Sequence, residues 1–135
     1  MTHLGLADGG AADLERPVLD ALRMQIGDWL LAPWSKDGHP DHDAVGRACE
    51  SAASRDGARL IAFPVWAWHW GEPADLPWHR ALRVDLSPEV RAAKAAAVAE
   101  FFTQVTPLGP LPEDVPVLPS YVLARFARPC EVVFA

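Results

Sequence analysis

Gly38-His39-Pro40-Asp41-His42 joins a short apolar run to the start of a predicted helix. The run before it, Trp29-Leu30-Leu31-Ala32-Pro33, is typical of a buried strand, and Gly38 marks the loop between the two. Pro40 suits the first helical position, and apolar residues then recur at helical spacing, at Val45, Ala48, Cys49 and Ala52. Because residues three apart on a helix share a face, His39 and His42 are expected to point the same way.

A second apolar run, residues 59–65, follows the helix predicted over residues 40–55. Gly57 lies between them and is suited to ending the helix. A strand, a helix and a strand in this order predict a βαβ unit with two parallel strands. Open α/β sheets bind ligands at the carboxyl ends of such strands, so His39 and His42 lie where a reactive site is expected.

Two interpretations of these histidines stay open on spacing alone. The first is a metal or catalytic site, in which Asp41 hydrogen-bonds to one imidazole and selects its tautomer. The second is a polar, well-capped helix start with no further role, since short motifs often occur by chance.

Three tryptophans alternate with other residues in Trp66-Ala67-Trp68-His69-Trp70, directly after the second predicted strand. The second predicted strand is expected to run into this segment. One interpretation is a wall for a sugar-like substrate, with His69 as a further polar group. The other is that the tryptophans anchor the core or a loop, as large aromatics often do, and that His69 is a hydrogen-bonded structural residue.

The second half of the chain predicts two further strands and two helices. Alternation over residues 80–86 is typical of a half-solvated strand. Ser87-Pro88-Glu89 predicts the start of a helix, with a core-facing stripe at Val90, Ala93, Ala97, Val98 and Phe101. A proline-rich connection, a short helix over residues 120–128 and a strand over residues 131–134 are expected to follow.

Composition narrows the class of protein. The 135 residues fit one domain, residues 1–135, and half of them are hydrophobic. The net charge of −6 argues against nucleic acid as a partner, because binding phosphates needs a basic face. We expect no membrane segment and no signal peptide, hence a cytoplasmic protein. Cys49 and Cys130 match no disulfide or metal pattern and are expected to be reduced core thiols.

Four segments resemble the PIG-L (LmbE-like) family of zinc-dependent N-deacetylases. Trp34 to Gly46 is similar to the second motif of that family, and Leu4-Gly5-Leu6-Ala7-Asp8-Gly9 to its Leu-Gly-x-x-Asp-Gly segment. Pro64 to Trp70 resembles an aromatic-rich segment of a bacterial subgroup, and Lys94 to Gln104 a Lys-helix-Ser-Gln signature with Thr103 in place of the serine. The first motif of the family, Ala/Pro-His-Pro-Asp-Asp-Glu, does not occur in the sequence. The chain therefore resembles the C-terminal half of the family's domain.

The resemblance implies a Rossmann-like, three-layer α/β/α fold and hydrolysis of an N-acyl (N-acetyl) amide on an amino-sugar-type small molecule. His42 matches a zinc ligand, one of about three that a catalytic zinc needs, and the other ligands and the general base belong to the absent motif. His39 and Asp41 match groups that assist the oxyanion or the leaving amine. Asp8, Trp66, Trp68 and His69 would face the substrate.

Three functional hypotheses follow. The chain is a hydrolase completed by an N-terminal half from elsewhere, a non-enzymatic remnant or partner subunit, or a metal-free carbohydrate-binding module that uses Trp66, Trp68 and Trp70. The family's first strands would pack beside residues 29–32, so without them we expect an exposed apolar sheet and either self-association or marginal stability.

Overall fold

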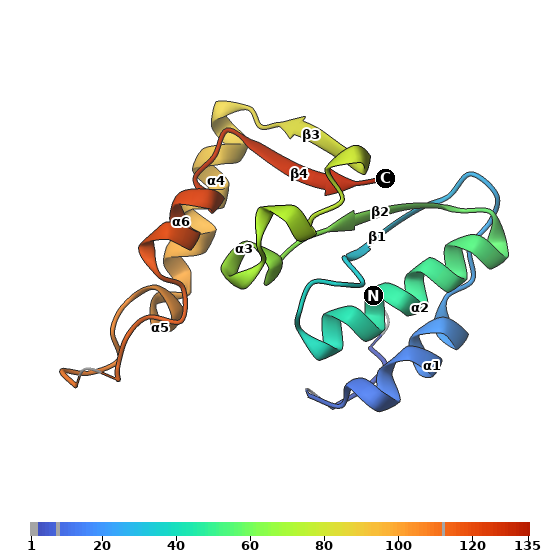
Figure 1. Cartoon of the computed structure of the whole chain (residues 1–135), viewed down its shortest axis with the longest axis horizontal. Helices are drawn as coiled ribbons and strands as arrows, with labels where there is room; N and C mark the ends of the chain where they lie inside the picture. Colours follow the sequence, from blue (N-terminus) through green and yellow to red (C-terminus); the bar gives the residue numbers. More distant parts are fainter. Residues whose placement is uncertain (1–2, 8, 112) are drawn as a thin grey trace. The chain divides into compact units, whose positions relative to one another are not determined.

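The computed structural model describes residues 3–7, 9–111 and 113–135, apart from the side chains of residues 11–14. Four strands form one open mixed sheet in the order β1-β2-β4-β3, with helices between them (Figure 1). The predicted α/β class is therefore confirmed in its general form. The chain divides into two compact units, Met1–Leu82 with Val132–Ala135 and Arg83–Glu131, and the single domain expected from the sequence stays a prediction.

The first unit is built on the predicted βαβ motif. Strand β1 (Trp29–Pro33), helix α2 (Pro40–Asp56) and strand β2 (Arg59–Phe63) follow one another, and the strands pair in parallel from Trp29 opposite Arg59 to Pro33 opposite Phe63. Gly57 ends α2 in the left-handed conformation, as expected. Strand β2 ends two residues earlier than predicted because Pro64, which has no N–H to donate, begins the turn that follows.

Small residues let α2 lie close to the strands. Ala44, Ala48 and Ala52 are fully buried, and so is Ala32 of β1. A Cβ at Gly46 would lie 2.7 Å from the Ser35 backbone, so this position admits no side chain without displacement. Phe134 of β4 (Cys130–Phe134) completes the core edge-on to Trp34, at 5.4 Å between ring centroids. This close packing sets where the start of α2 lies relative to the end of β1.

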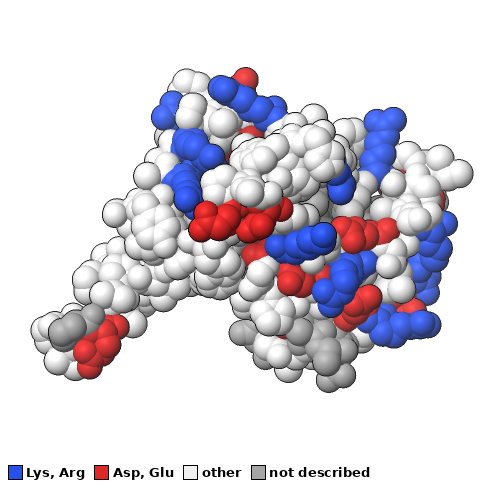
Figure 2. All heavy atoms as spheres, in the orientation of Figure 1, with Lys and Arg blue, Asp and Glu red and all other residues white. Residues whose placement is uncertain are grey.

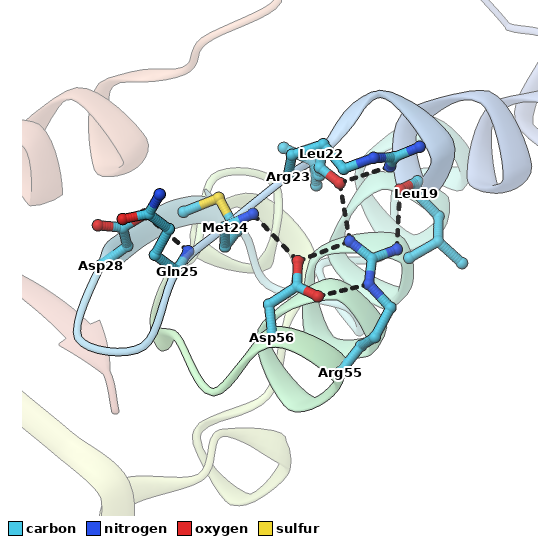
Figure 3. Close-up of polar contacts among 8 residues, drawn as sticks. All are labelled: Leu19, Leu22, Arg23, Met24, Gln25, Asp28, Arg55 and Asp56. Carbon is cyan, nitrogen blue, oxygen red and sulfur yellow. Dashed lines mark hydrogen bonds and ion pairs between the residues drawn. The ribbon is translucent and has the colours of Figure 1, made fainter.

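Helix α1 (Ala11–Ala21) packs on α2, and a polar clamp joins their C-terminal ends (Figure 3). The Arg55 guanidinium donates to the carbonyl oxygens of Leu19 and Leu22, at 3.3 and 2.7 Å. It also pairs with Asp56, which accepts the Met24 backbone N–H at 3.0 Å. These two interactions, the Arg55 hydrogen bond first, lower the pKa of Asp56 to about 2.

The second unit contains α4 (Pro88–Glu100), α5 (Phe102–Val105) and α6 (Ser120–Phe126). It also contains β3 (Ala81–Asp85) from Arg83 onward. Ser87 caps α4 as predicted, accepting the Val90 N–H at 3.3 Å. The predicted core stripe of α4 is wrong, because Val90 and Phe101 are 51% and 60% exposed and no residue of α4 is buried. Alanines on every side of α4 blur its apolar periodicity, so the sequence does not single out the half-buried face, which carries Lys94 and Val98.

The sheet exposes apolar side chains at both ends of the strand order. Trp29 and Leu31 on β1 are 60% and 65% exposed, and Leu82 and Val84 on β3 are also exposed. The expected exposed apolar surface is thus present, whereas self-association stays a prediction. In the view of Figure 2 the surface around α5 is nearly free of charged side chains, apart from an acidic group at the end of the loop that follows α5.

Two sequence expectations concern the thiols and the membrane. Cys49 is buried, Cys130 is half-buried, and both are free thiols in the structure. Burial raises the pKa of the Cys49 thiol. Within residues 3–7, 9–111 and 113–135, no helix is both long and apolar enough to cross a bilayer.

Candidate functional site

Residues 38–42 lie at the carboxyl ends of β1 and β2, as predicted, and Asp37 lies directly before them. Strand β1 ends at Pro33, and the Trp34 N–H still bonds to the Phe63 carbonyl oxygen, at 2.9 Å. The loop then turns at Gly38, whose φ of 85° favours glycine, and enters α2 at Pro40. The loop after β1 and the segment after β2 thus meet at one edge of the parallel pair, where α/β proteins place their ligands.

The centre of the site is Asp37, a fully buried carboxylate. Its Oδ1 accepts the backbone N–H groups of Val65 and Ala67, at 2.7 and 3.0 Å. Its Oδ2 accepts the Trp66 N–H at 2.9 Å. Asp37 therefore joins the loop after β1 to the segment after β2 and holds both in one conformation.

His42 pairs with the same carboxylate. Its Nδ1 lies 2.7 Å from Asp37 Oδ2, and its side chain is 27% exposed. Because an ionised carboxylate only accepts hydrogen bonds, Nδ1 carries the proton and Nε2 of the neutral ring keeps its lone pair. His42 is therefore held with Nε2 available as a ligand or a base, the arrangement found behind many metal-ligating histidines.

In His39 the donor and acceptor nitrogens are exchanged relative to His42. His39 is the N-cap residue of α2, and its Nδ1 accepts the Asp41 backbone N–H across a long 3.3 Å. In the neutral ring the proton then lies on Nε2, which is left as a donor. The two rings lie 4.8 Å apart between centroids, so a lone pair and an N–H donor are presented side by side.

Asp41 does not make the carboxylate–imidazole hydrogen bond expected of it, because Asp37 makes that bond to His42. The Asp41 carboxylate is 9% exposed, and its Oδ2 instead accepts the Gly9 N–H at 2.7 Å. Its Oδ1 is buried and has no hydrogen-bond partner among the described residues. Asp41 thus holds the segment before α1 against the site and meets His39 only through its backbone.

The tryptophan segment is a helical turn and does not continue β2, so the predicted continuation of the strand through the tryptophans is wrong. Helix α3 spans Ala67–Trp70 and starts from Trp66. Residues four apart share a helical face, so Trp66 and Trp70 stack at 4.7 Å and 12°. Trp68 lies two residues from each and turns into the core, at 8% exposed.

The indole stack continues into the histidines. His39 lies parallel to Trp66, at 6.1 Å and 15° between the rings, and His69 lies against both Trp66 and Trp70. The structure thus gathers four of the predicted site residues in one cluster, namely His39, His42, Trp66 and His69. Asp8, predicted to face the substrate, lies outside the described residues.

A cavity of about 410 Å³ adjoins this cluster. Its lining includes Asp37, Gly38 and the half-exposed Trp70, together with Lys36 and Asp75. A Cβ at Gly38 would collide with the indole Nε1 of Trp70, so the absence of a side chain at Gly38 makes room for the indole. A volume of this size matches small-molecule pockets, which commonly hold roughly 300–1,000 Å³.

Sequence reasoning missed Asp37 and left Trp70 out of the principal substrate residues. Asp37 lies within the stretch that resembles the second motif, but nothing in its five-residue separation from His42 indicates a contact. The available signal was a carboxylate in the loop directly after a buried strand. Trp70 would have followed from reading Trp66 and Trp70 as an i, i+4 pair.

The described donors supply one candidate position for a metal ligand. His42 Nε2 is suited to one ligand position. In the part of the chain that is described, no three His, Cys, Asp or Glu side chains are grouped to hold a metal ion. The zinc expectation therefore stays a prediction.

Comparisons with protein-family models, with curated proteins and with solved structures found no match.

Proposed function

We propose that this chain contributes part of the active site of a zinc-dependent N-deacetylase of the PIG-L (LmbE-like) type, acting on an N-acyl amino-sugar-type substrate. The observation that carries the proposal is the hydrogen bond from His42 Nδ1 to the buried Asp37 carboxylate, at 2.7 Å. In the neutral ring this bond leaves the Nε2 lone pair at the carboxyl ends of two parallel strands, within the stretch that resembles the family's second motif.

The described donors fit one zinc-ligand position and not a complete site. When bound, zinc would supply Lewis-acid activation of an amide carbonyl and of water. In this proposal the remaining ligands and the general base come from a complementing polypeptide segment that carries the His-Pro-Asp-Asp motif. A three-layer, Rossmann-like α/β/α fold belongs to the same proposal. So does a location in the cytoplasm.

The chain's own residues have separate tasks. Asp37 keeps His42 in the tautomer with Nε2 unprotonated. His39 presents Nε2–H, which donates to an oxyanion or to the departing amine, a role worth roughly a hundredfold or more in rate. The half-exposed indole of Trp70 offers apolar contact to a sugar ring, with Trp66 stacked behind it, and Asp75 and Lys36 offer polar groups in the adjoining cavity.

Zinc content and amide hydrolysis together test the assignment. The isolated chain should lose zinc in a chelator wash, since one histidine does not make a site. When it is mixed with a polypeptide that carries the His-Pro-Asp-Asp motif, zinc and release of acetate from N-acetyl sugars should both appear.

Three histidine variants separate the roles in that mixture. His42→Ala should lose zinc and activity together, whereas His39→Ala should keep zinc and lose mainly turnover. His79→Ala, in an exposed turn, is the matched control. Stoichiometric zinc in the washed isolated chain, or loss of zinc from His39→Ala, would contradict the assignment.

The second candidate is metal-free carbohydrate binding, and the exposed face of Trp70 beside the 410 Å³ cavity favours it. Binding of N-acetylglucosamine in the presence of a chelator, lost in Trp70→Ala and retained in His42→Ala, would support this candidate. The same binding lost equally in both variants would count against it.

A further inference from the structure

The unit Arg83–Glu131 holds a second cavity, of about 470 Å³, which is separate from the histidine site. Its lining comes from α4, from Val105 of α5, and from α6 with the two residues after it. The volume lies within the range of roughly 300–1,000 Å³ that small-molecule pockets occupy. No part of the proposed deacetylase mechanism uses this cavity.

The inner lining is apolar. Val98, Val105, Leu123 and Phe126 are half-buried and face this space from three helices. Ala95 and Ala99 flank Val98 on α4 and leave the volume unfilled, because their side chains are short. An apolar group that enters the cavity gains burial without displacing a side chain.

The charged lining residues all have one sign. Arg91, Lys94 and Arg128 line the cavity, and no acidic residue is among the lining residues described. Lys94 is partly neutralised by its ion pair with Glu131 and lies 5.8 Å from the centre of the Phe126 ring. Basic side chains gather over α4 in the view of Figure 2.

Arg91 is the cation best suited to an external partner. Its side chain is exposed, and its guanidinium makes no hydrogen bond or ion pair with any residue in the described ranges. Arg128, by comparison, donates through Nε to the Arg125 carbonyl oxygen at 2.7 Å. A planar guanidinium next to an apolar cavity matches a carboxylate that is attached to an apolar body.

We propose that this cavity binds a small amphipathic carboxylate, with the carboxylate at Arg91 and the apolar chain against Val98 and Phe126. Positive charge selects against cations, and the apolar lining selects against short polar anions. A neutral molecule of the same shape would fill the cavity but leave the guanidinium without an acceptor.

Calorimetric titration of the full chain with octanoate, below its micelle concentration, tests the proposal. We expect saturable binding at one site. Hexanoate should bind roughly tenfold more weakly, because two fewer methylenes are buried. Octan-1-ol should also bind about tenfold more weakly for lack of a charge, and octylammonium should not bind measurably.

Two variants on α4, each with a control, test where the ligand binds. Arg91→Gln should weaken octanoate binding about tenfold, whereas Arg83→Gln, which removes a charge outside the cavity, should not. Ala99→Leu should fill the space and abolish binding, and Ala96→Leu, exposed on α4 but absent from the lining, is its control. Octan-1-ol binding as tightly as octanoate, equal effects of the two leucine variants, or no saturable binding would overturn the proposal.

Discussion

Replacing Asp37 by asparagine tests the structural centre of the site. The carboxylate accepts four hydrogen bonds, three from backbone N–H groups and one from His42. If the amide oxygen takes the Oδ1 place, the bonds to Val65 and Ala67 remain. The NH₂ group then faces the Trp66 N–H and the His42 Nδ1–H, so two donors are left without an acceptor.

The number of hydrogen bonds lost sets the size of the destabilisation. A hydrogen bond to a charged group contributes about 1.5–3 kcal/mol, so losing two would cost roughly 3–6 kcal/mol. Asparagine also removes a buried charge, which offsets part of this, so we expect about 3–4 kcal/mol in Asp37→Asn. His42→Ala loses one of the four bonds and should cost less, about 1.5–3 kcal/mol. Either loss is large against a typical total stability of about 5–15 kcal/mol.

Urea unfolding provides the assay. All six tryptophans lie between Trp29 and Trp78, so tryptophan fluorescence follows the unit Met1–Leu82 with Val132–Ala135. Asp43→Asn is the matched control, because the Asp43 side chain accepts only the Gly38 N–H, at 3.1 Å, from among the described residues, and asparagine can still accept it. If Asp37→Asn were no less stable than Asp43→Asn, the reasoning about Asp37 would be refuted.

Three further predictions concern acid stability, assembly and the tryptophan stack. The pKa of Asp56 is lowered to about 2, so its contribution to folding is complete above about pH 4 and is lost as the pH falls toward 2. Asp56→Asn should therefore lower the melting temperature at pH 6 and flatten its fall between pH 4 and pH 2; an unchanged slope would contradict this. Leu31→Lys, at a side chain that is 65% exposed on β1, should reduce self-association in sedimentation, and a wild-type chain that is monomeric at high concentration would refute the expected apolar interface. Gly38→Ala should displace Trp70 and change its near-ultraviolet circular dichroism, whereas Gly5→Ala, which also replaces a positive-φ glycine but has open space around it, should not.

The sequence predicted the parts of the fold that depend on local pattern. Two apolar runs, a proline at the start of α2 and Gly57 at its end were enough to place the βαβ unit and its parallel strands. Helix α3 was missed because four residues are too few to show a helical period, and alternation of tryptophan with smaller residues imitates a strand. On α4, alanines on every side concealed which face packs.

At the site, too, residues within one short motif could be predicted, whereas contacts between distant parts of the sequence could not. His39 and His42 could be found because both belong to one short motif at a helix start. Asp37 could not, since its role depends on the turn at Gly38 and on contacts with residues 65–67, which are about 30 positions away. The partner of Asp41 was mispredicted for the same reason, because its hydrogen bond to Gly9 spans 32 positions.

The protonation of the two imidazoles, read from nitrogen-15 chemical shifts near neutral pH, tests the central claim most directly. The proposed site requires His42 to carry its proton on Nδ1, facing Asp37, and His39 to carry its proton on Nε2. In Asp37→Asn the preference of His42 should weaken while that of His39 is unchanged. A His42 ring protonated on Nε2 in the wild-type chain would leave no lone pair for a ligand position and would contradict the proposal.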